Sequence, residues 1–371
     1  MMRKTIVVVL MMWLAACSGP DRETPVDDAI ALRSRMATAP DPGFERATTP
    51  RPFTFPRDHG PHPTFATEWW YLTGNLVADD GHRFGYQLTL FRIGLKPGQS
   101  VDDSAWRTHQ VYMGHLAVSD IDAGRQHSAE RLSRAAVGLA GAQAQPLRVW
   151  LGAWSISGGT ETFPLQVEAG HDDIGIRLRI GRGDRPLVLQ GDHGLSRKGD
   201  AAGNASYYYS LTRLPSDGRI QIGGNTYRVA GQSWLDREWS TSALAPDQAG
   251  WDWFALQLDD GRDLMFYRMR GRDGLAQPFS SGTLVAADGH ATPLSLADVD
   301  ARPLRYWQAH DGVRYPVEWQ VKVAAQGLDL RVSAAFDAQE MRHTVRYWEG
   351  AVTVTGSQRG VGYLELAGYA D

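Results

Sequence analysis

The chain has 371 residues, with 40 glycines, 13 tryptophans and a single cysteine, and its formal net charge is only −4. Acidic and basic residues are mixed without a basic block, which argues against nucleic-acid binding. One cysteine excludes disulfides within the chain. The length exceeds what one hydrophobic core usually serves, so two domains are expected.

The first predicted element is an export signal. Arg3 and Lys4 supply positive charge, and an apolar run follows over residues 6–14. This run is too short to span a bilayer comfortably. The Leu-Ala-Ala-Cys sequence that ends at Cys17 resembles a bacterial lipobox, which implies cleavage before Cys17, its lipidation, and membrane attachment by acyl chains. An ordinary signal peptide with an incidental cysteine is the alternative.

Residues 1–17 are therefore predicted to be a lipoprotein signal peptide, and the protein an exported lipoprotein of the bacterial cell envelope. Ser18 follows the cysteine, and in Gram-negative bacteria that position usually permits transfer to the outer membrane. We expect the protein on the periplasmic face of that membrane. Residues 18–50 are polar and proline-bearing, which predicts a flexible tether.

Past residue 50, alternation of apolar and polar residues dominates, as in residues 177–180, and helical periodicity is mainly confined to residues 129–141. Period two is typical of half-buried antiparallel strands. Together with the glycine-rich turns, it predicts an all-β sandwich or barrel, present twice. We expect the two domains over residues 51–218 and 219–371.

A motif of acidic and aromatic residues occurs once in each half. The first copy is Thr67-Glu68-Trp69-Trp70-Tyr71, followed by Asp-Asp-Gly at residues 79–81. The second combines Asp236-Arg237-Glu238-Trp239 with Trp251-Asp252-Trp253-Phe254, followed by Asp-Asp-Gly at residues 259–261. A strand, an Asp-Gly turn and a second strand are the signature of a β-hairpin, so each half is predicted to contain one.

These motifs resemble the AttH-like family of lipocalin-like proteins, which includes a carotenoid hydratase. The resemblance covers the chain from Phe53 onward and is carried by residues 55–62, 67–74, 231–240, 250–254, 347–352 and 362–366. It implies two tandem lipocalin-like antiparallel β-barrels packed against each other on an exported protein. Some members are encoded with an ABC-transporter permease. Many are described as secreted hydrolases, and the characterised chemistry is addition of water to an isoprenoid double bond.

Hydration of an alkene needs an acid that protonates one carbon and a pocket that tolerates the resulting cation. A carboxylic acid in apolar surroundings can be that acid, and aromatic faces stabilise the cation. The resemblance places Asp236 at the aspartate of a Trp-x-Asp motif and makes it the first catalytic candidate. Glu238 shares the same face of an extended strand and is the second. Pairing of both carboxylates with backbone donors or arginines is the structural alternative.

Glu68 has the same two interpretations. Beside the tryptophans that follow it, Glu68 would be a tuned acid or base, whereas a salt bridge from Arg92 or Arg268 would make it structural. The aromatic residues near the candidate carboxylates are candidates for binding an apolar ligand: Trp69, Trp70, Tyr71, Trp234, Trp239, Trp251 and Trp253.

His59 is a further catalytic candidate, as a proton relay, because it lies in a segment whose Gly and Pro content predicts a loop. His59 and His62 also raise the question of zinc. The sequence has no HExxH or paired-cysteine pattern, so no metal site and no cofactor are expected.

Three functions remain open at this stage. The first is an enzyme, a hydratase (lyase) or hydrolase, acting on an apolar lipid or isoprenoid-like molecule. The second is a carrier that holds such a ligand and works with an ABC-transporter permease, and the third is a scaffold whose aromatic residues are all core. The predicted anchor at Cys17 departs from the pigment enzyme and argues against a carotenoid as the substrate.

Overall fold

The computed structural model describes residues 42–97, 104–242 and 244–370. The predicted signal peptide, Cys17 and the tether up to residue 41 lie outside them. Residues 42–50, the end of the predicted tether, pack on the first sheet: Phe44 and Ala47 are buried, and Tyr207 donates a 2.9 Å hydrogen bond to the carbonyl of Thr49. Within the described ranges, no helix has the length and apolar character that crossing a membrane requires.

The described chain is all β, with two short 3₁₀ turns, η1 (Arg57–His59) and η2 (Ala324–Gln326). The strands of the first sheet are β1 (Thr67–Ala78), β2 (Arg83–Gly94), β3 (Gln110–Asp120), β4 (Arg125–Arg134), β5 (Ala140–Gln143), β6 (Arg148–Leu151), β7 (Trp154–Ser157), β8 (Leu165–His171), β9 (Ile174–Ile180), β10 (Val188–Leu189), β11 (Leu195–Arg197), β12 (Ala205–Ile222) and β13 (Asn225–Ser240). The strands of the second sheet are β14 (Gln248–Leu258), β15 (Asp263–Gly271), β16 (Ser281–Val285), β17 (Ala291–Ser295), β18 (Asp300–Gln308), β19 (Arg314–Val323), β20 (Leu328–Ala334), β21 (Glu340–Arg342), β22 (Arg346–Gly356) and β23 (Gly360–Ala367).

Both predicted Asp-Gly hairpins are present. Ala78 and His82 close the turn between β1 and β2, and Leu258 and Arg262 close the turn between β14 and β15. Gly81 and Gly261 have φ angles of +91° and +88°, which glycine adopts without steric cost. The turn chemistry therefore fixes where each central hairpin reverses.

Each sheet curves around a core of its own, and the prediction of two lipocalin-like barrels is confirmed. The first sheet runs in the order β4-β3-β2-β1-β13-β12-β9-β8-β7-β6-β5, and β6 returns to contact β2, β3 and β4. The second runs in the order β17-β16-β15-β14-β23-β22-β20-β19-β18. Inward-pointing aliphatic and aromatic residues fill both interiors, as period-two alternation requires.

The first sheet ends at Ser240 and the second begins at Gln248, so the boundary between the domains is not at the predicted position between residues 218 and 219. The reason is the long hairpin of β12 and β13, since β13 pairs with the whole length of β1. Glu68 and Asp236, assigned from sequence to different domains, therefore lie on adjacent strands of one barrel.

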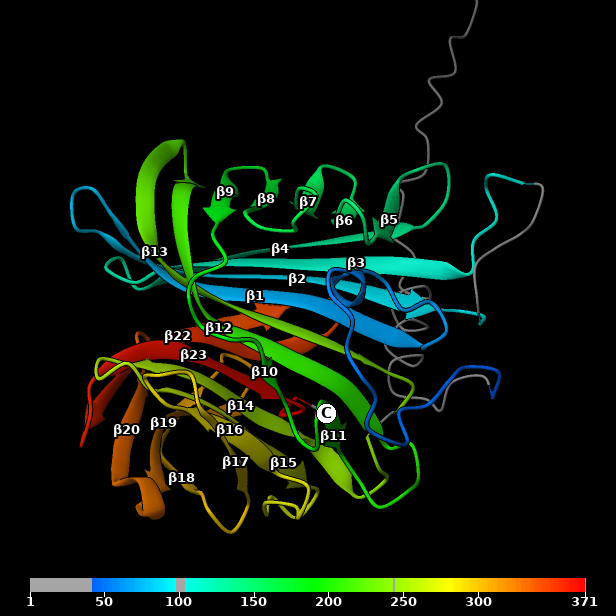
Figure 1. Cartoon of the computed structure of the whole chain (residues 1–371). Coiled ribbons are helices and arrows are strands. Elements are labelled where there is room, and N and C mark those ends of the chain that lie inside the picture. The colour runs from blue at the N-terminus through cyan, green and yellow to red at the C-terminus, as the bar shows by residue number, and fades with distance from the viewer. Residues whose placement is uncertain (1–41, 98–103, 243, 371) are drawn as a thin grey trace, which may run out of the picture.

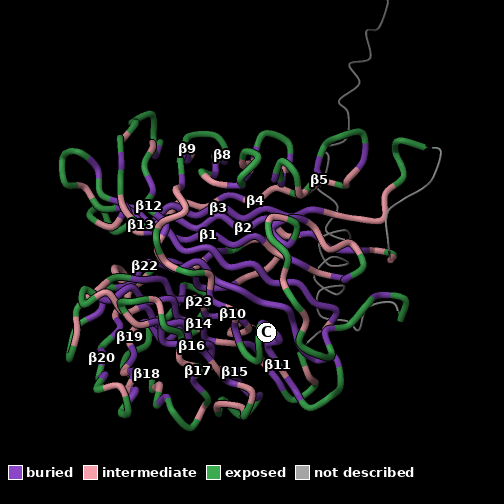
Figure 2. Tube along the Cα trace, in the orientation of Figure 1, coloured by how far each residue is buried: buried purple, intermediate pink, exposed green. Residues whose placement is uncertain are grey.

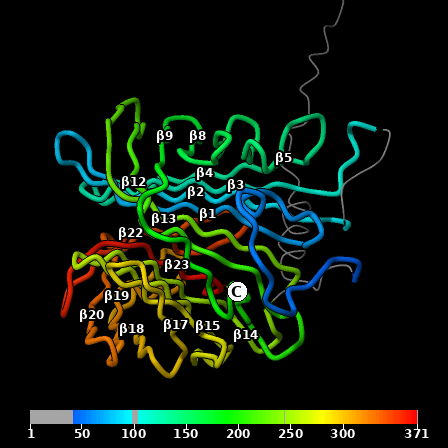
Figure 3. Tube along the Cα trace, viewed as in Figure 1, coloured from blue at the N-terminus to red at the C-terminus, as the bar shows by residue number. Residues whose placement is uncertain are grey.

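The two barrels face each other across their central strands. Figure 1 shows β1, β2, β12 and β13 above β14, β22 and β23, and contacts join β2 to β22 and β1 to β23. In the trace of Figure 3, the C-terminal strands, in red, lie beneath β1, in blue. Buried residues run along these central strands, whereas the hairpin ends are exposed (Figure 2). A third apolar cluster fills the layer between the barrels.

Candidate active site

Alternation along β13 separates its side chains into two sets. Trp234 packs in the layer between the barrels, and Asp236 and Glu238 share its side of the strand. Arg237 and Trp239 point to the opposite side, toward η1 and the segment before β1. The predicted common face of Trp234, Asp236 and Glu238 is thus turned toward the second barrel.

Asp236 is buried, with 3% of its surface exposed, and it accepts three hydrogen bonds. Ser210 and Trp234 donate to Oδ1 at 2.5 and 2.7 Å, and Tyr208 donates to Oδ2 at 2.5 Å. The neighbouring strand β12 supplies two of these donors, because Ser210 lies directly opposite Asp236. Burial outweighs the three donors and raises the pKa of Asp236 to about 7.

The second barrel completes the surroundings of Asp236 through Trp253 on β14. The Trp253 indole donates to the Tyr208 hydroxyl at 3.1 Å, and its ring meets Tyr71 and Trp234 edge to face, with centroids 5.1 and 6.5 Å apart. Such perpendicular contacts are a favourable arrangement of aromatic rings. The carboxyl of one barrel is therefore enclosed by aromatic residues of both.

Two further carboxyls reach this layer from the second barrel. Glu349 on β22 and Glu365 on β23 are direct cross-strand neighbours. Glu349 is fully buried and accepts a 2.7 Å bond from the Tyr71 hydroxyl, and Glu365 accepts a 3.0 Å bond from the Trp251 indole. Burial raises the pKa of Glu365 to about 7 and that of Glu349 well above its usual range.

Glu238 lies beside a cation, whereas the described residues place none beside the other carboxyls of this layer. The Lys198 ammonium is 3.4 Å from Glu238, 3.1 Å from the Ser196 hydroxyl and 3.7 Å from the centroid of the Tyr267 ring. Burial disfavours the charge of Lys198, but Glu238 and Tyr267 outweigh it and raise the pKa of the lysine. The opposite charges of Lys198 and Glu238 therefore compensate each other at the edge of the aromatic layer.

Comparison with known proteins identifies the relatives of this chain. The profile of the AttH-like family matches residues 46–369. The chain belongs to the AttH-like family. Among solved structures, a protein described as AttH from Nitrosomonas europaea shares 34% sequence identity, with a TM-score of 0.79 over 88% of this chain and 100% of that chain.

Kievitone hydratase from Nectria haematococca shares the fold at 15% identity, with a TM-score of 0.65 over 90% of this chain and 98% of that chain. No curated protein sequence matches the chain significantly. The match of the family profile over residues 46–369 confirms the predicted family.

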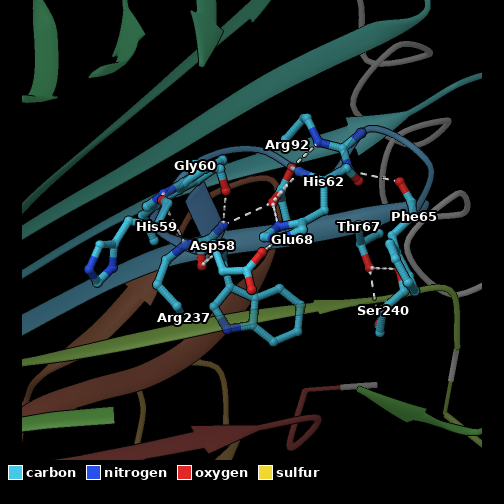
Figure 4. A network of polar contacts seen from close by, with 12 residues as sticks. Asp58, His59, Gly60, His62, Phe65, Thr67, Glu68, Arg92, Arg237 and Ser240 are labelled. Atoms are coloured by element: carbon cyan, nitrogen blue, oxygen red, sulfur yellow. Dashed lines mark hydrogen bonds and ion pairs between the residues drawn. The ribbon is translucent and has the colours of Figure 1, made fainter. Parts of the chain in front are cut away.

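Glu68 lies on the other side of the first sheet from Asp236, and the two do not share a site. Figure 4 shows Glu68 surrounded by Arg92, Arg237 and His62. Arg92 Nε and Arg237 Nη2 both pair with it, the latter at 3.0 Å, and the backbone N–H of His62 donates at 3.0 Å. Burial opposes ionisation of Glu68, but Arg92, His62 and Arg237 outweigh it and hold its pKa well below the usual range.

His59, at the end of η1, and His62, three residues later, also lie on that side of the sheet, and they contact different partners. His62 stacks on Trp239 with ring centroids 3.7 Å apart and bridges Glu68 and Asp58, at 3.2 and 3.3 Å. The ring of His59 points away from Glu68 in Figure 4 and lies 2.6 Å from the Tyr209 hydroxyl. Burial and nearby arginines lower the pKa of His59 to about 4.

The predicted aromatic ligand-binding residues divide between the same two sides. Those in or against the layer between the barrels are Trp69, Tyr71, Trp234, Trp251 and Trp253. Trp70 belongs to the interior of the first barrel, and Trp239 packs with the segment that precedes β1. Only the first group shares the layer between the barrels with Asp236.

Sequence reasoning missed the carboxyls Glu349 and Glu365 and the donors Tyr208 and Ser210. A signal for the first two was present. Each glutamate follows an aromatic residue at a spacing of two, Tyr347 before Glu349 and Tyr363 before Glu365, which repeats the aromatic-x-acid pattern of Trp234 and Asp236.

Metal sites and surface pockets are the two other kinds of site to consider in the molecule. Over residues 42–97, 104–242 and 244–370, no group of three or more His, Cys, Asp or Glu side chains is arranged to hold a metal ion. A surface depression of about 420 Å³ lies on the second barrel, lined by Leu304, Gln320, Asp329, Leu330, Arg331, Thr355, Gly356 and Ser357. None of the carboxyls or aromatic residues described above lines it.

Proposed function

We propose that this protein binds an apolar, lipid or isoprenoid-like molecule between its two barrels and catalyses acid-assisted addition or removal of water. The observation that carries the proposal is the state of Asp236. It is buried among aromatic rings of both barrels, without a cationic partner among the described residues, and its pKa of about 7 leaves a proton available near neutral pH.

The aromatic residues around Asp236 also suit the step that follows proton transfer. Protonation of an alkene produces a carbocation, which the faces of Trp234, Trp253 and Tyr71 would stabilise. Family membership and the shared fold of kievitone hydratase support water addition as the type of reaction. The anchor at Cys17 and a place in the cell envelope belong to the same proposal, as the means of meeting a membrane-derived substrate.

Deuterium exchange tests this function. Protein that begins at Ser18 is incubated in D₂O with the tertiary isoprenoid alcohols linalool and nerolidol, and deuterium at carbon is measured by mass spectrometry. Wild type should incorporate deuterium about 10²-fold faster than Asp236→Asn, the size of a typical general-acid contribution. Asp217→Asn, which removes a carboxyl of β12 that is 64% exposed, should behave like wild type.

A carrier would give a different result. Native mass spectrometry after exposure to a bacterial lipid extract would then show the same ligand, unchanged in mass, on wild type and on Asp236→Asn, and neither protein would exchange deuterium. That outcome would replace the enzyme by a hydrophobic-ligand carrier working with a membrane partner such as an ABC-transporter permease.

A further inference from the structure

The buried carboxyls of this protein fall into two classes. Most are paired with a cation, as Glu68 is with two arginines, Asp252 with Arg268 and Arg270, and Asp263 with Arg213. Three carboxyls in the layer between the barrels make no ion pair within the described residues: Asp236 and Glu349, which are buried, and Glu365, which is half-buried. Burying a carboxyl without a cation is costly, and functional sites are where that cost is retained.

The positions of Glu349 and Glu365 add to this cost. They face each other directly on antiparallel strands, where two like charges are destabilising. Glu349 Oε2 is buried and has no hydrogen-bond partner among the described residues, so Glu349 is better accommodated as the neutral acid. Glu365 is therefore the member of the pair that ionises.

Glu365 also differs from Asp236 in access. As a residue, Glu365 is half-buried, as are Trp69 and Trp251 in the same layer, whereas Asp236 is buried. Glu365 lies opposite Trp253 in the register of β14 and β23, and Trp253 contacts the Tyr208 hydroxyl that binds Asp236. Tyr208 and Trp253 thus lead from the buried carboxyl of the first barrel to the strand position opposite Glu365 on the second.

We propose that Glu365 is the second catalytic carboxyl, the base that accepts a proton from the attacking water, and that the active site is complete only where the two barrels meet. This inference rests on the proposed function and assigns the other half of its acid–base chemistry. Asp236 comes from the first barrel and Glu365 from the second, with Tyr71 linking β1 of the first barrel to Glu349 on β22 of the second.

The step balances without any co-reactant except water. The Asp236 carboxylic acid gives its proton to one alkene carbon, the π electrons form the new C–H bond, and the other carbon becomes a cation. Water attacks that cation and forms the C–O bond, and the proton it loses goes to the Glu365 carboxylate. The product is an alcohol, with Asp236 ionised and Glu365 protonated. Loss of the proton from Glu365 to solvent and reprotonation of Asp236 restore the starting state.

Two isotopes separate the two carboxyls. In the reverse direction, protonated Glu365 expels the hydroxyl of a tertiary alcohol as water, and recapture from H₂¹⁸O labels the alcohol. Deuterium at carbon reports Asp236, and ¹⁸O in linalool or nerolidol reports Glu365. Glu365→Gln should lower ¹⁸O exchange by about 10²-fold or more and lower deuterium incorporation with it. Asp236→Asn should lower deuterium incorporation more than ¹⁸O exchange.

Asp329→Asn is the matched control, because it removes a carboxyl of the second barrel that is 53% exposed. An active wild type with an equally active Glu365→Gln would overturn the role of Glu365 and leave the proposed function standing. A wild type that exchanges neither isotope would overturn the proposed function and the role of Glu365 together. Circular dichroism establishes that each variant is folded.

A pH profile tests the same role if Glu365→Gln does not fold. Trp251→Phe removes the indole donor that favours ionised Glu365, so the pH above which ¹⁸O exchange falls should move upward by about one unit. The titratable groups that act on Glu365 or share its surroundings are Asp236, Glu238, Glu349, Tyr71 and Tyr347. An unmoved profile would show that Glu365 does not carry the proton.

Discussion

At the scale of single residues, Asp236 and Glu68 show how surroundings decide the chemistry of a buried carboxyl. Both lie beside tryptophans on adjacent strands of one sheet. Glu68 is held by two guanidinium groups and a backbone N–H, which keep it ionised. Asp236 receives only neutral donors, so burial prevails and its pKa rises to about 7. A buried carboxyl is therefore structural on one face of the first sheet, at Glu68, and a candidate acid on the other, at Asp236.

Asp236 should make folding stability depend on pH in a definite direction. Its pKa rises from 3.8 in the unfolded chain to about 7, so the folded state binds the proton more tightly. That contribution to stability is fully present below pH 4 and is lost as the pH rises through 7. Between pH 5 and pH 8, urea denaturation should show wild type losing more unfolding free energy than Asp236→Asn, by an amount on the order of 2–3 kcal/mol. Equal losses in the two proteins would contradict the raised pKa.

At the scale of elements, pairing of strands brings together groups that are distant in sequence. β1 lies between β2 and β13, so Glu68 sits opposite Arg92 on one side and Trp239 on the other, with Arg237 two residues from Trp239 along β13. Pairing also overrides local pattern. Residues 129–141, whose period indicates a helix, form the end of β4 and the turn into β5, because β3 supplies a complete hydrogen-bonded edge for β4.

Removal of the Glu68 carboxylate should destabilise the first barrel. Glu68→Gln leaves the buried Arg92 and Arg237 without their counter-charge, and breaking such a pair typically costs about 3–5 kcal/mol. Chemical denaturation at pH 7 measures the loss. Because the pKa of Glu68 is lowered on folding, the carboxylate contributes above pH 4.5, and the difference between variant and wild type should shrink as the pH falls toward the folded pKa.

Glu168→Gln is the control for that substitution, since Glu168 is 52% exposed and pairs with Arg177 on the surface. It should change stability by no more than about 0.5 kcal/mol. A Glu68→Gln protein as stable as this control would show that the arginines are adequately compensated by their backbone carbonyl partners.

At the scale of the whole molecule, the contact between barrels is both a packing surface and the site. Hydrogen bonds cross it from several strands, including Tyr71 to Glu349 and Ser119 to Gln339, at 2.7 and 2.8 Å. The barrels approach closely at Gly85 on β2, because a Cβ there would lie 2.8 Å from the Ala351 Cβ and from the Tyr363 hydroxyl. No side chain fits at that point unless the barrels move apart.

Gly85→Val should therefore separate the barrels slightly while leaving each one folded. We expect an unchanged far-ultraviolet circular dichroism spectrum, a loss of about 1–3 kcal/mol in stability from overpacking, and a fall of about 10²-fold in isotope exchange from misplaced groups. Gly159→Val is the control, since a Cβ at that position has nothing within 4 Å. Full exchange activity in Gly85→Val would show that the reaction does not need both barrels in register.

The sequence by itself determined the all-β class, the two central hairpins, the family and the common face of Trp234, Asp236 and Glu238, because period-two alternation and Asp-Gly turns are local properties of the chain. Tertiary structure decided which face meets the second barrel, which carboxyls lack a cation, and that Glu349 and Glu365 join Asp236. These depend on strand pairing and on the contact between sheets, which join residues more than a hundred positions apart, such as Glu68 with Trp239 and Tyr71 with Glu349. Alternation assigns a side chain to a face, and only packing determines what that face meets.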